Sequence, residues 1–549
     1  GADTLDVLGS LVDKSLVVAA PGDDGGMRYR LLETVAEYAG ERLDEAGDRA
    51  EAERRHLVHY RELARLADPA LRGGGQAVWL RRLETEHGNV TAALRTAVDL
   101  GAEQEALCLV LSMSWFWQLR ARQADARVWS QAAAALGPDP FAPPVRHAVP
   151  LADRCTDTPP PWSEEQLWEA RRGCRLLVLA SEGGEGATAL ERPETRARLD
   201  AIVSAYRPGM PQNCRQPGTM WFFARLMTGE FRSLDETLDA LLSASRAEGL
   251  GWDLAFTHLL RAKLLGDRPA DAEAALAHFE RERDAWGIAE SRSARGEAYE
   301  RSGRLAEAAA DYELAARAAA GLGARSQATV FKARLAAVRL RLPSMDTETG
   351  REERASAERL LVEASVEASA ESSGEPVSTA RLLLAQHYGH TGRTALAREQ
   401  VDRMEAEFRG DTPDLFLGVT GALRGWLDCL DGAYADAADR LTRAVRDVEG
   451  LAYLVAPYLV VGLFPTAAWA RAGRGGPHDA EDGARLLAAY DAHRGDAGGA
   501  GFRPFTEQTE SAVRAHAERA LREALDEATY ARRYEEGAAL SVREAAALV

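Results

Sequence analysis

Residues 289–319 read AESRSARGEAYERSGRLAEAAADYELAARAA, and small and aromatic residues recur in them at a regular spacing. The recurring positions are Gly296, Tyr299, Gly303, Ala308, Tyr312 and Ala315. The small side chains let two helices approach closely, and the tyrosines fill the gap to a neighbouring pair. Gly303 permits a tight turn, because glycine adopts backbone angles that other residues avoid. The stretch therefore predicts two helices that pack against each other as a hairpin.

The same pattern returns further along the chain. Residues 382–397 read LLLAQHYGHTGRTALA, and residues 422–444 read ALRGWLDCLDGAYADAADRLTRA. Weaker copies lie around Ala275 and Phe279 and over residues 469–492. This spacing is typical of the tetratricopeptide repeat, a helical hairpin of about 34 residues. We therefore predict an all-α fold, an α-solenoid of such hairpins in which the first helices line a concave groove.

The 549 residues are 46% hydrophobic, 28% charged and 7% aromatic, a composition typical of a globular protein. Aspartate and glutamate total 85 against 67 lysines and arginines, which gives a formal net charge of −18. Such an acidic surface makes broad binding to nucleic acid or anionic lipid unfavourable. The five cysteines lie at least 19 residues apart without a CxxC pair, which argues against a zinc knuckle or a disulfide framework. We therefore expect a cytoplasmic protein.

One uncharged stretch, residues 451–470, has the length of a membrane span. It is interrupted by Pro457, Gly462 and Pro465. Proline breaks a continuous helix, so the stretch favours buried helices joined at a proline turn over a membrane helix. We expect no contact with a membrane.

The first 47 residues predict a different kind of structure. A helix runs from about Asp6 into a short strand that ends near Val18, and the turn at residues 21–26 leads to a returning strand at 27–31. A helix over 32–46 follows and ends before Gly47. Helix, β-hairpin and helix in this order indicate the C-terminal part of a winged-helix domain.

The remaining chain divides at its proline-rich and polar segments. Residues 137–161 contain eight of the 22 prolines and predict an extended connector. The predicted parts are a partial winged helix at 1–47, helical hairpins at 48–136, a Pro/Gly-rich connector with some helix at 137–219, tetratricopeptide-like repeats at 220–342, a polar linker with helix at 343–376, and repeats with C-terminal helices at 377–549.

The motifs of common catalytic and metal sites are missing from the sequence. It contains no GxxxxGK[ST] phosphate loop, no GxSxG and no HExxH. Two histidine pairs at helical spacing, His56/His59 and His387/His390, have no evident third ligand, so a surface or packing role is favoured over a metal site. Cys429 is interpreted as a small buried hydrophobe. We expect no catalytic residue, metal or cofactor in this chain.

Candidate binding residues follow from helix register. If first helices line the concave face, the residues that point into it are Glu290, Glu297, Glu300, Arg301, Gln386, His390 and Trp426. The glutamates predict a preference for a basic peptide. A second candidate is the aromatic cluster of Trp115, Trp117 and Trp129, for which helix packing is the favoured interpretation and a small-effector pocket the alternative.

Several stretches resemble one family of regulators. LVDKSLVV (11–18) and RYRLLETVAEYAGERLDEAG (28–47) resemble the winged-helix end of AfsR-like, Streptomyces antibiotic regulatory protein-type STAND regulators, which contain an NB-ARC ATPase. Residues 54–71, 79–94 and 534–549 resemble helices that follow the winged helix and the C-terminal end of such proteins. The resemblance covers about 5–136 and 256–549. One departure concerns the family's Met-His-Asp motif, whose histidine contacts nucleotide, because Leu31, Leu32 and Glu33 stand at those positions.

The resemblance implies the sensor and regulatory arm of a transcriptional regulator. The arm would bind a protein, a peptide or a small effector and contact ATPase and DNA-binding domains that precede it. Residues 1–136 carry 16 basic and 21 acidic residues, so we expect no direct binding to nucleic acid by this part. The chain lacks an initiator methionine, and we expect it to be a piece of a longer protein. The alternative is a freestanding tetratricopeptide scaffold without a role in transcription.

Overall fold

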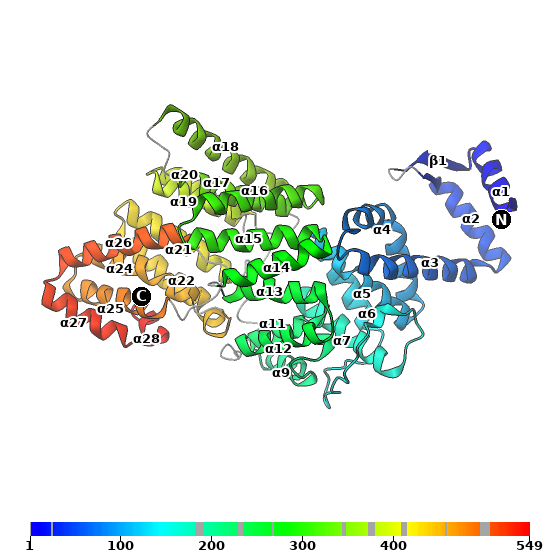
Figure 1. Ribbon diagram of the computed structural model, residues 1–549, viewed down its shortest axis with the longest axis horizontal. Helices are drawn as coiled ribbons and strands as arrows, with labels where there is room; N and C mark the ends of the chain where they lie inside the picture. Colours follow the sequence, from blue (N-terminus) through cyan, green and yellow to red (C-terminus); the bar gives the residue numbers. More distant parts are fainter. Residues whose placement is uncertain are drawn as a thin grey trace. The chain divides into compact units, whose positions relative to one another are not determined.

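The computed structural model describes most of the chain (Figure 1). The described residues are 2–22, 26–181, 192–228, 234–265, 268–342, 347–371, 379–407, 414–455, 458–494 and 505–549. In these ranges the protein is almost entirely helical, and its one sheet has two strands. The prediction of an all-α chain with a small β-hairpin near the N-terminus is confirmed.

The chain forms two compact units, each with its own internal packing. The first comprises residues 1–71, 77–138 and 154–175. The second comprises residues 72–76, 139–153 and 176–549.

The first unit begins with the β-hairpin and continues as helices. Its elements are α1 (Ala2–Asp13), β1 (Val17–Pro21), β2 (Met27–Leu31), α2 (Glu33–Ala46), α3 (Arg49–Ala70), α4 (Gln76–Asp99), α5 (Glu103–Leu119), α6 (Gln123–Ala134), the short 3-10 helix η1 (Cys155–Asp157) and the start of α7 (Glu164–Ser181). The strands pair antiparallel, with Val17 opposite Leu31. Gly47 ends α2 in the left-handed conformation at φ +76°, as predicted for a helix terminator.

The second unit is a succession of helices. They are α9 (Pro193–Ala205), α10 (Pro211–Cys214), α11 (Met220–Met227), α12 (Leu234–Ala247), α13 (Gly251–Leu265), α14 (Pro269–Glu282), α15 (Ala285–Arg301), α16 (Leu305–Gly321), α17 (Arg325–Arg339), α18 (Glu348–Glu371), α19 (Thr379–His390), α20 (Thr394–Ala406), α21 (Asp414–Leu430), α22 (Tyr434–Val455), α23 (Tyr458–Val461), α24 (Phe464–Arg474), α25 (Pro477–His493), α26 (Glu507–Ala524), α27 (Glu527–Ala538) and α28 (Val542–Ala546). From α13 to α18 each helix packs on the next, and α13 also contacts α15. This arrangement is that of an α-solenoid.

The three repeats found in the sequence form helix pairs with the same turn. Gly303, Gly392 and Gly432 join α15 to α16, α19 to α20 and α21 to α22, and their φ angles are +73°, +73° and +76°. A side chain at such an angle is strained, so glycine is favoured. In the first pair, a Cβ on Gly296 would lie 3.0 Å from the Tyr312 ring, which shows how closely the two helices approach. The predicted role of the small residues is confirmed.

The uncharged stretch matches its prediction, whereas the proline-rich segment can be described only by its local structure. Residues 137–161 contain no helix other than η1. The described part of 451–470 belongs to the end of α22, to α23 and to α24, whose residues are largely buried from Leu459 onward. No helix in the described ranges combines the length and the apolar character needed to cross a bilayer.

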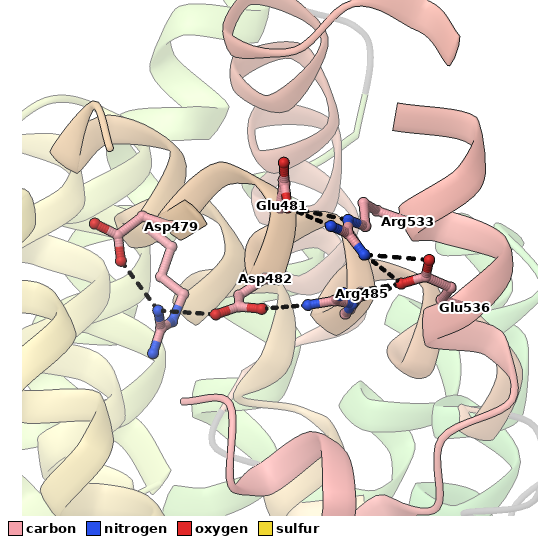
Figure 2. Close-up of polar contacts among 7 residues, drawn as sticks. Asp479, Glu481, Asp482, Arg485, Arg533 and Glu536 are labelled. Carbon is pink, nitrogen blue, oxygen red and sulfur yellow. Dashed lines mark hydrogen bonds and ion pairs between the residues drawn. The ribbon is translucent and has the colours of Figure 1, made fainter. Parts of the chain in front are cut away.

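At the C-terminal end, charged side chains link α25 to α27 (Figure 2). Arg533 pairs with Glu481 of α25 at 2.7 Å and with Glu536 of its own helix at 2.8 Å. Arg485 of α25 pairs with the same Glu536 at 2.9 Å and with Asp482 at 2.7 Å. Each of these five charged side chains therefore faces an opposite charge, and the ion pairs of Glu481 with Arg533 and of Arg485 with Glu536 join the two helices.

Candidate interaction groove

The predicted groove residues of α19 and α21 converge on one short segment, Phe505–Thr509, which lies at the start of α26. The side-chain oxygen Oε1 of Gln386 accepts hydrogen bonds from the backbone N–H of Thr506 at 2.8 Å and from the hydroxyl of Thr509 at 2.7 Å. The Thr506 hydroxyl lies 3.1 Å from the same oxygen. Gln386 is only 2% exposed, so its side-chain oxygen contacts this segment and not solvent.

His390 and Trp426 complete the site. The imidazole Nε2 of His390 lies 2.9 Å from Thr509 Oγ1, and its ring lies 5.3 Å from the Trp426 ring. The Trp426 ring also packs against the Phe505 ring in a T-shaped arrangement, with 5.9 Å between the ring centroids. Gly389 makes room for the indole, because a Cβ there would lie 2.3 Å from Trp426 Cη2.

The hydrogen-bond pattern favours one tautomer of His390. When the Thr509 hydroxyl donates its single proton to Gln386, its oxygen accepts from Nε2–H of His390. Burial lowers the pKa of His390, and the charges of His387, Arg341 and His516 lower it further. A neutral imidazole that carries its proton on Nε2 satisfies both conditions.

These contacts correct one part of the prediction. Gln386, His390 and Trp426 do lie together, but Gln386 and Trp426 are buried and not open to solvent. The reason is that the chain's own Phe505–Thr509 fills the space that they line. The sequence could not reveal this contact, because its partners are about 120 residues apart.

The three glutamates of α15 each meet a partner from a neighbouring helix. Glu290 is buried and pairs with Lys263 of α13 and Gln327 of α17. Glu297 pairs with Arg334 of α17 at 2.8 Å.

Glu300 accepts a hydrogen bond from the Tyr312 hydroxyl at 3.0 Å and pairs with Arg341. The carboxylates of α15 are therefore balanced by Lys263, Arg334 and Arg341. The preference of these glutamates for a basic peptide stays a prediction. Arg301, at the end of the same helix, is half-buried.

The aromatic candidates lie in the first unit. Trp115 and Trp117 are buried in α5, and Trp129 on α6 is half-buried. Burial is what helix packing requires of α5. A small-effector pocket at these residues stays a prediction.

The predicted histidine pairs have local partners. His387 lies 3.1 Å from Glu358 of α18 and 3.0 Å from Arg393, whereas His56 and His59 both contact the Tyr60 ring. Cys429 is buried, and burial raises the pKa of its thiol, as expected of a small hydrophobe. All five cysteines are free and buried.

A further buried carboxylate in the second unit could not be identified from the motifs in the sequence. Asp284 precedes α15 and is completely buried. It accepts hydrogen bonds from Trp252 Nε1 at 2.8 Å and from the backbone N–H of Gly287 at 2.7 Å. The backbone N–H of Gly73 at 3.1 Å and the Gln76 amide at 3.3 Å are its other donors.

Asp284 therefore holds the segment 72–76 against the start of α15. Burial raises the pKa of Asp284, although hydrogen bonds from these four donors oppose the shift. Since every neighbour donates, the geometry favours the carboxylate over the protonated acid. The only local signal for this role is an aspartate at the N-cap position of a helix.

Comparison with known proteins gives partial matches. The chain is 41% identical over 127 residues to proteins named "Putative HTH-type transcriptional regulator" from Mycobacterium bovis and Mycobacterium tuberculosis. The matched region covers 23% of this chain and 14% of each relative, so the chain spans a small fraction of their length. No protein-family model matches the chain. No solved structure matches it at a significant level.

Proposed function

We propose that this chain is the sensor and regulatory interaction region of a multidomain, ATPase-type transcriptional regulator. The observation that carries the proposal is its 41% identity over 127 residues with proteins named as HTH-type transcriptional regulators. An α-solenoid supports it, because stacked helical hairpins expose extended surfaces that bind proteins and peptides. Fold by itself does not name a function, so the relatives carry the assignment to transcription.

The proposal also includes tetratricopeptide-like hairpins and a partial winged helix. The glycine turns at Gly303, Gly392 and Gly432 and the contact of Gly296 with Tyr312 support tetratricopeptide-like hairpins. The order α1, β1, β2, α2 supports the C-terminal part of a winged helix.

The N-terminal β-hairpin supports contact with protein and not with DNA. Pairing places Met27, Tyr29 and Leu31 on one face opposite Pro21, Ala19 and Val17, so that this face carries only apolar residues. Met27, Tyr29 and Leu31 are 54%, 49% and 41% exposed. Residues 1–47 carry ten acidic and four basic residues, which disfavours a phosphate backbone. In the proposal, this apolar face contacts the ATPase domain of the whole protein.

Regulation by such an arm requires only a modest energy. A signal that binds one arrangement of the regulator better by ~1–3 kcal/mol shifts the populations severalfold to about a hundredfold. The signal would be a protein, a peptide or a small effector bound by the solenoid.

Transcript profiling of a strain that lacks the gene tests the proposal. We expect a discrete set of transcripts to change and to recover when the gene is restored. Unchanged transcripts would instead favour a freestanding tetratricopeptide scaffold.

Restoring the full gene with single substitutions sharpens the test. Tyr29→Asp places a charge on the apolar face of the hairpin and should alter the same transcripts. Ala20→Asp is the matched control, because Ala20 is exposed on the opposite face of the hairpin. If both variants restore the transcripts equally, this face does not contact the ATPase domain.

A further inference from the structure

We infer that Gln386, His390 and Trp426 form a peptide-binding site whose present occupant is the chain's own Phe505–Thr509. Its external ligand would be a segment with an aromatic residue followed by a helix that starts with threonines. The inference rests on the proposed function in one respect, namely that the solenoid acts by binding partners.

The polar half of the site binds the first turn of a helix. Gln386 Oε1 accepts from the backbone N–H of Thr506, the N-cap residue of α26, and from the hydroxyl of Thr509 one helical turn later. In the tautomer that carries its proton on Nε2, His390 donates to that same hydroxyl. Thr509 therefore donates and accepts at once, a role that serine can fill and valine cannot.

The apolar half of the site is an aromatic slot. Phe505 is 3% exposed and packs edge-on against the Trp426 ring. The indole in turn lies against Gly389, where a side chain would occupy the same space. The slot therefore favours a flat aromatic side chain at the position before the helix.

The contact can be exchanged when the first turn of α26 unwinds, because Thr506 caps that helix and Thr509 lies in its first turn. The body of α26 packs on α24 and α25, which lie next to it in the chain. The site on α19 and α21 contacts only this first turn and Phe505, through side chains and one backbone N–H. A ligand that offers the same groups can replace this turn while the rest of α26 stays on α24 and α25.

Fluorescence anisotropy with a labelled peptide tests the inference. The probe is a synthetic copy of residues 503–512, RPFTEQTESA, added to the full chain. Because the internal segment competes, we expect weak binding to the wild-type chain and at least about tenfold tighter binding to a Phe505→Ala/Thr509→Val variant. Adding Gln386→Ala to that variant should abolish the gain.

Two peptide variants and one protein variant serve as controls. A peptide with Thr509→Val should lose binding, whereas a peptide with Thr509→Ser should keep it. Gln508→Ala in the chain should leave the affinity at the wild-type level, because Gln508 lies on the same tip and is exposed. Equal affinities for the wild-type chain and the Phe505→Ala/Thr509→Val variant would overturn the inference.

A second measurement covers the case in which the double variant does not fold. Hydrogen exchange of the wild-type chain with excess peptide should show faster exchange at residues 505–510, because the peptide displaces them. No change in exchange would overturn the inference. The two proposals can fail separately. If transcripts change in the deletion strain but the peptide does not bind, the proposed function is supported and this peptide-binding site is ruled out.

Discussion

Glycine sets the distance between helices at several points of the solenoid. A Cβ on Gly296 would press on the Tyr312 ring, and a Cβ on Gly425 would lie 2.8 Å from Leu441 Cγ. At Gly389 the contact is closer than at these two glycines, since a Cβ would lie 2.3 Å from Cη2 of the buried Trp426 ring. A rigid ring in a packed core cannot move aside cheaply, so overpacking there costs stability.

Gly389→Ala should therefore destabilise the chain by about 1–3 kcal/mol. The Trp426 ring must shift to admit the methyl group, and its contact with Phe505 should weaken with it. Urea denaturation followed by circular dichroism gives the free energy of unfolding.

Gly321→Ala is the control for that experiment, because no atom lies within 4 Å of the added methyl group. Alanine is the better helix former, so this variant should be neutral or slightly more stable. Equal effects of the two substitutions would contradict the proposed packing of Trp426 on Gly389.

Asp284 is a second residue on which local structure depends. Asp284→Asn keeps the shape of the side chain but replaces one acceptor oxygen with an NH₂ group among four donors. Leaving buried donors without an acceptor should cost about 3 kcal/mol. The free energy of unfolding measures the loss, and faster hydrogen exchange at Gly73 and Gln76 would show where it arises. Asp436→Asn, on an exposed position of α22, should cost a few tenths of a kcal/mol at most.

At the scale of elements, the α25–α27 network shows how charges join two helices. Arg533 and Arg485 share Glu536, and Arg533 also reaches Glu481 on α25 (Figure 2). These side chains are partly exposed, so salt in the solvent screens their attraction.

Arg533→Ala should lower the thermal midpoint slightly in a low-salt buffer, and the effect should shrink at about 1 M salt. Differential scanning fluorimetry at both salt concentrations checks this. A loss of the same size at both would mean that the aliphatic part of Arg533 contributes through packing and not through its charge.

At the scale of the whole molecule, histidines whose pKa is lowered by partial burial couple stability to pH. Burial lowers the pKa of His56, His87, His278, His387 and His390. Between the lowered pKa of each folded site and the ordinary value near 6.5, the unfolded chain binds more protons than the folded one. Stability should therefore fall as the pH drops below about 6.5 and level off below the lowered values.

Urea midpoints at several pH values around 6.5 check this prediction. His390→Gln, which cannot gain a proton, should flatten part of the pH dependence and still donate toward Thr509. The prediction would be contradicted if the wild-type chain became more stable on acidification and the variant showed the same dependence of the urea midpoint on pH.

Local sequence patterns were enough to predict the helix pairs and their turns. Spacing of small and aromatic residues placed the helix pairs, glycines marked their turns, and prolines marked the extended connector. It also placed Gln386, His390 and Trp426 on neighbouring first helices. These features depend on residues less than about 35 positions apart, where backbone preference and helix register act directly.

Tertiary structure alone decided what those residues contact. The glutamates of α15 are balanced by cations from adjacent helices, and Phe505–Thr509 fills the space lined by Gln386 and Trp426. Asp284 likewise binds Gly73 and Gln76, more than 200 residues away in the chain. Such contacts arise from how the helices stack, and no local preference encodes the distance between residues that are far apart in sequence.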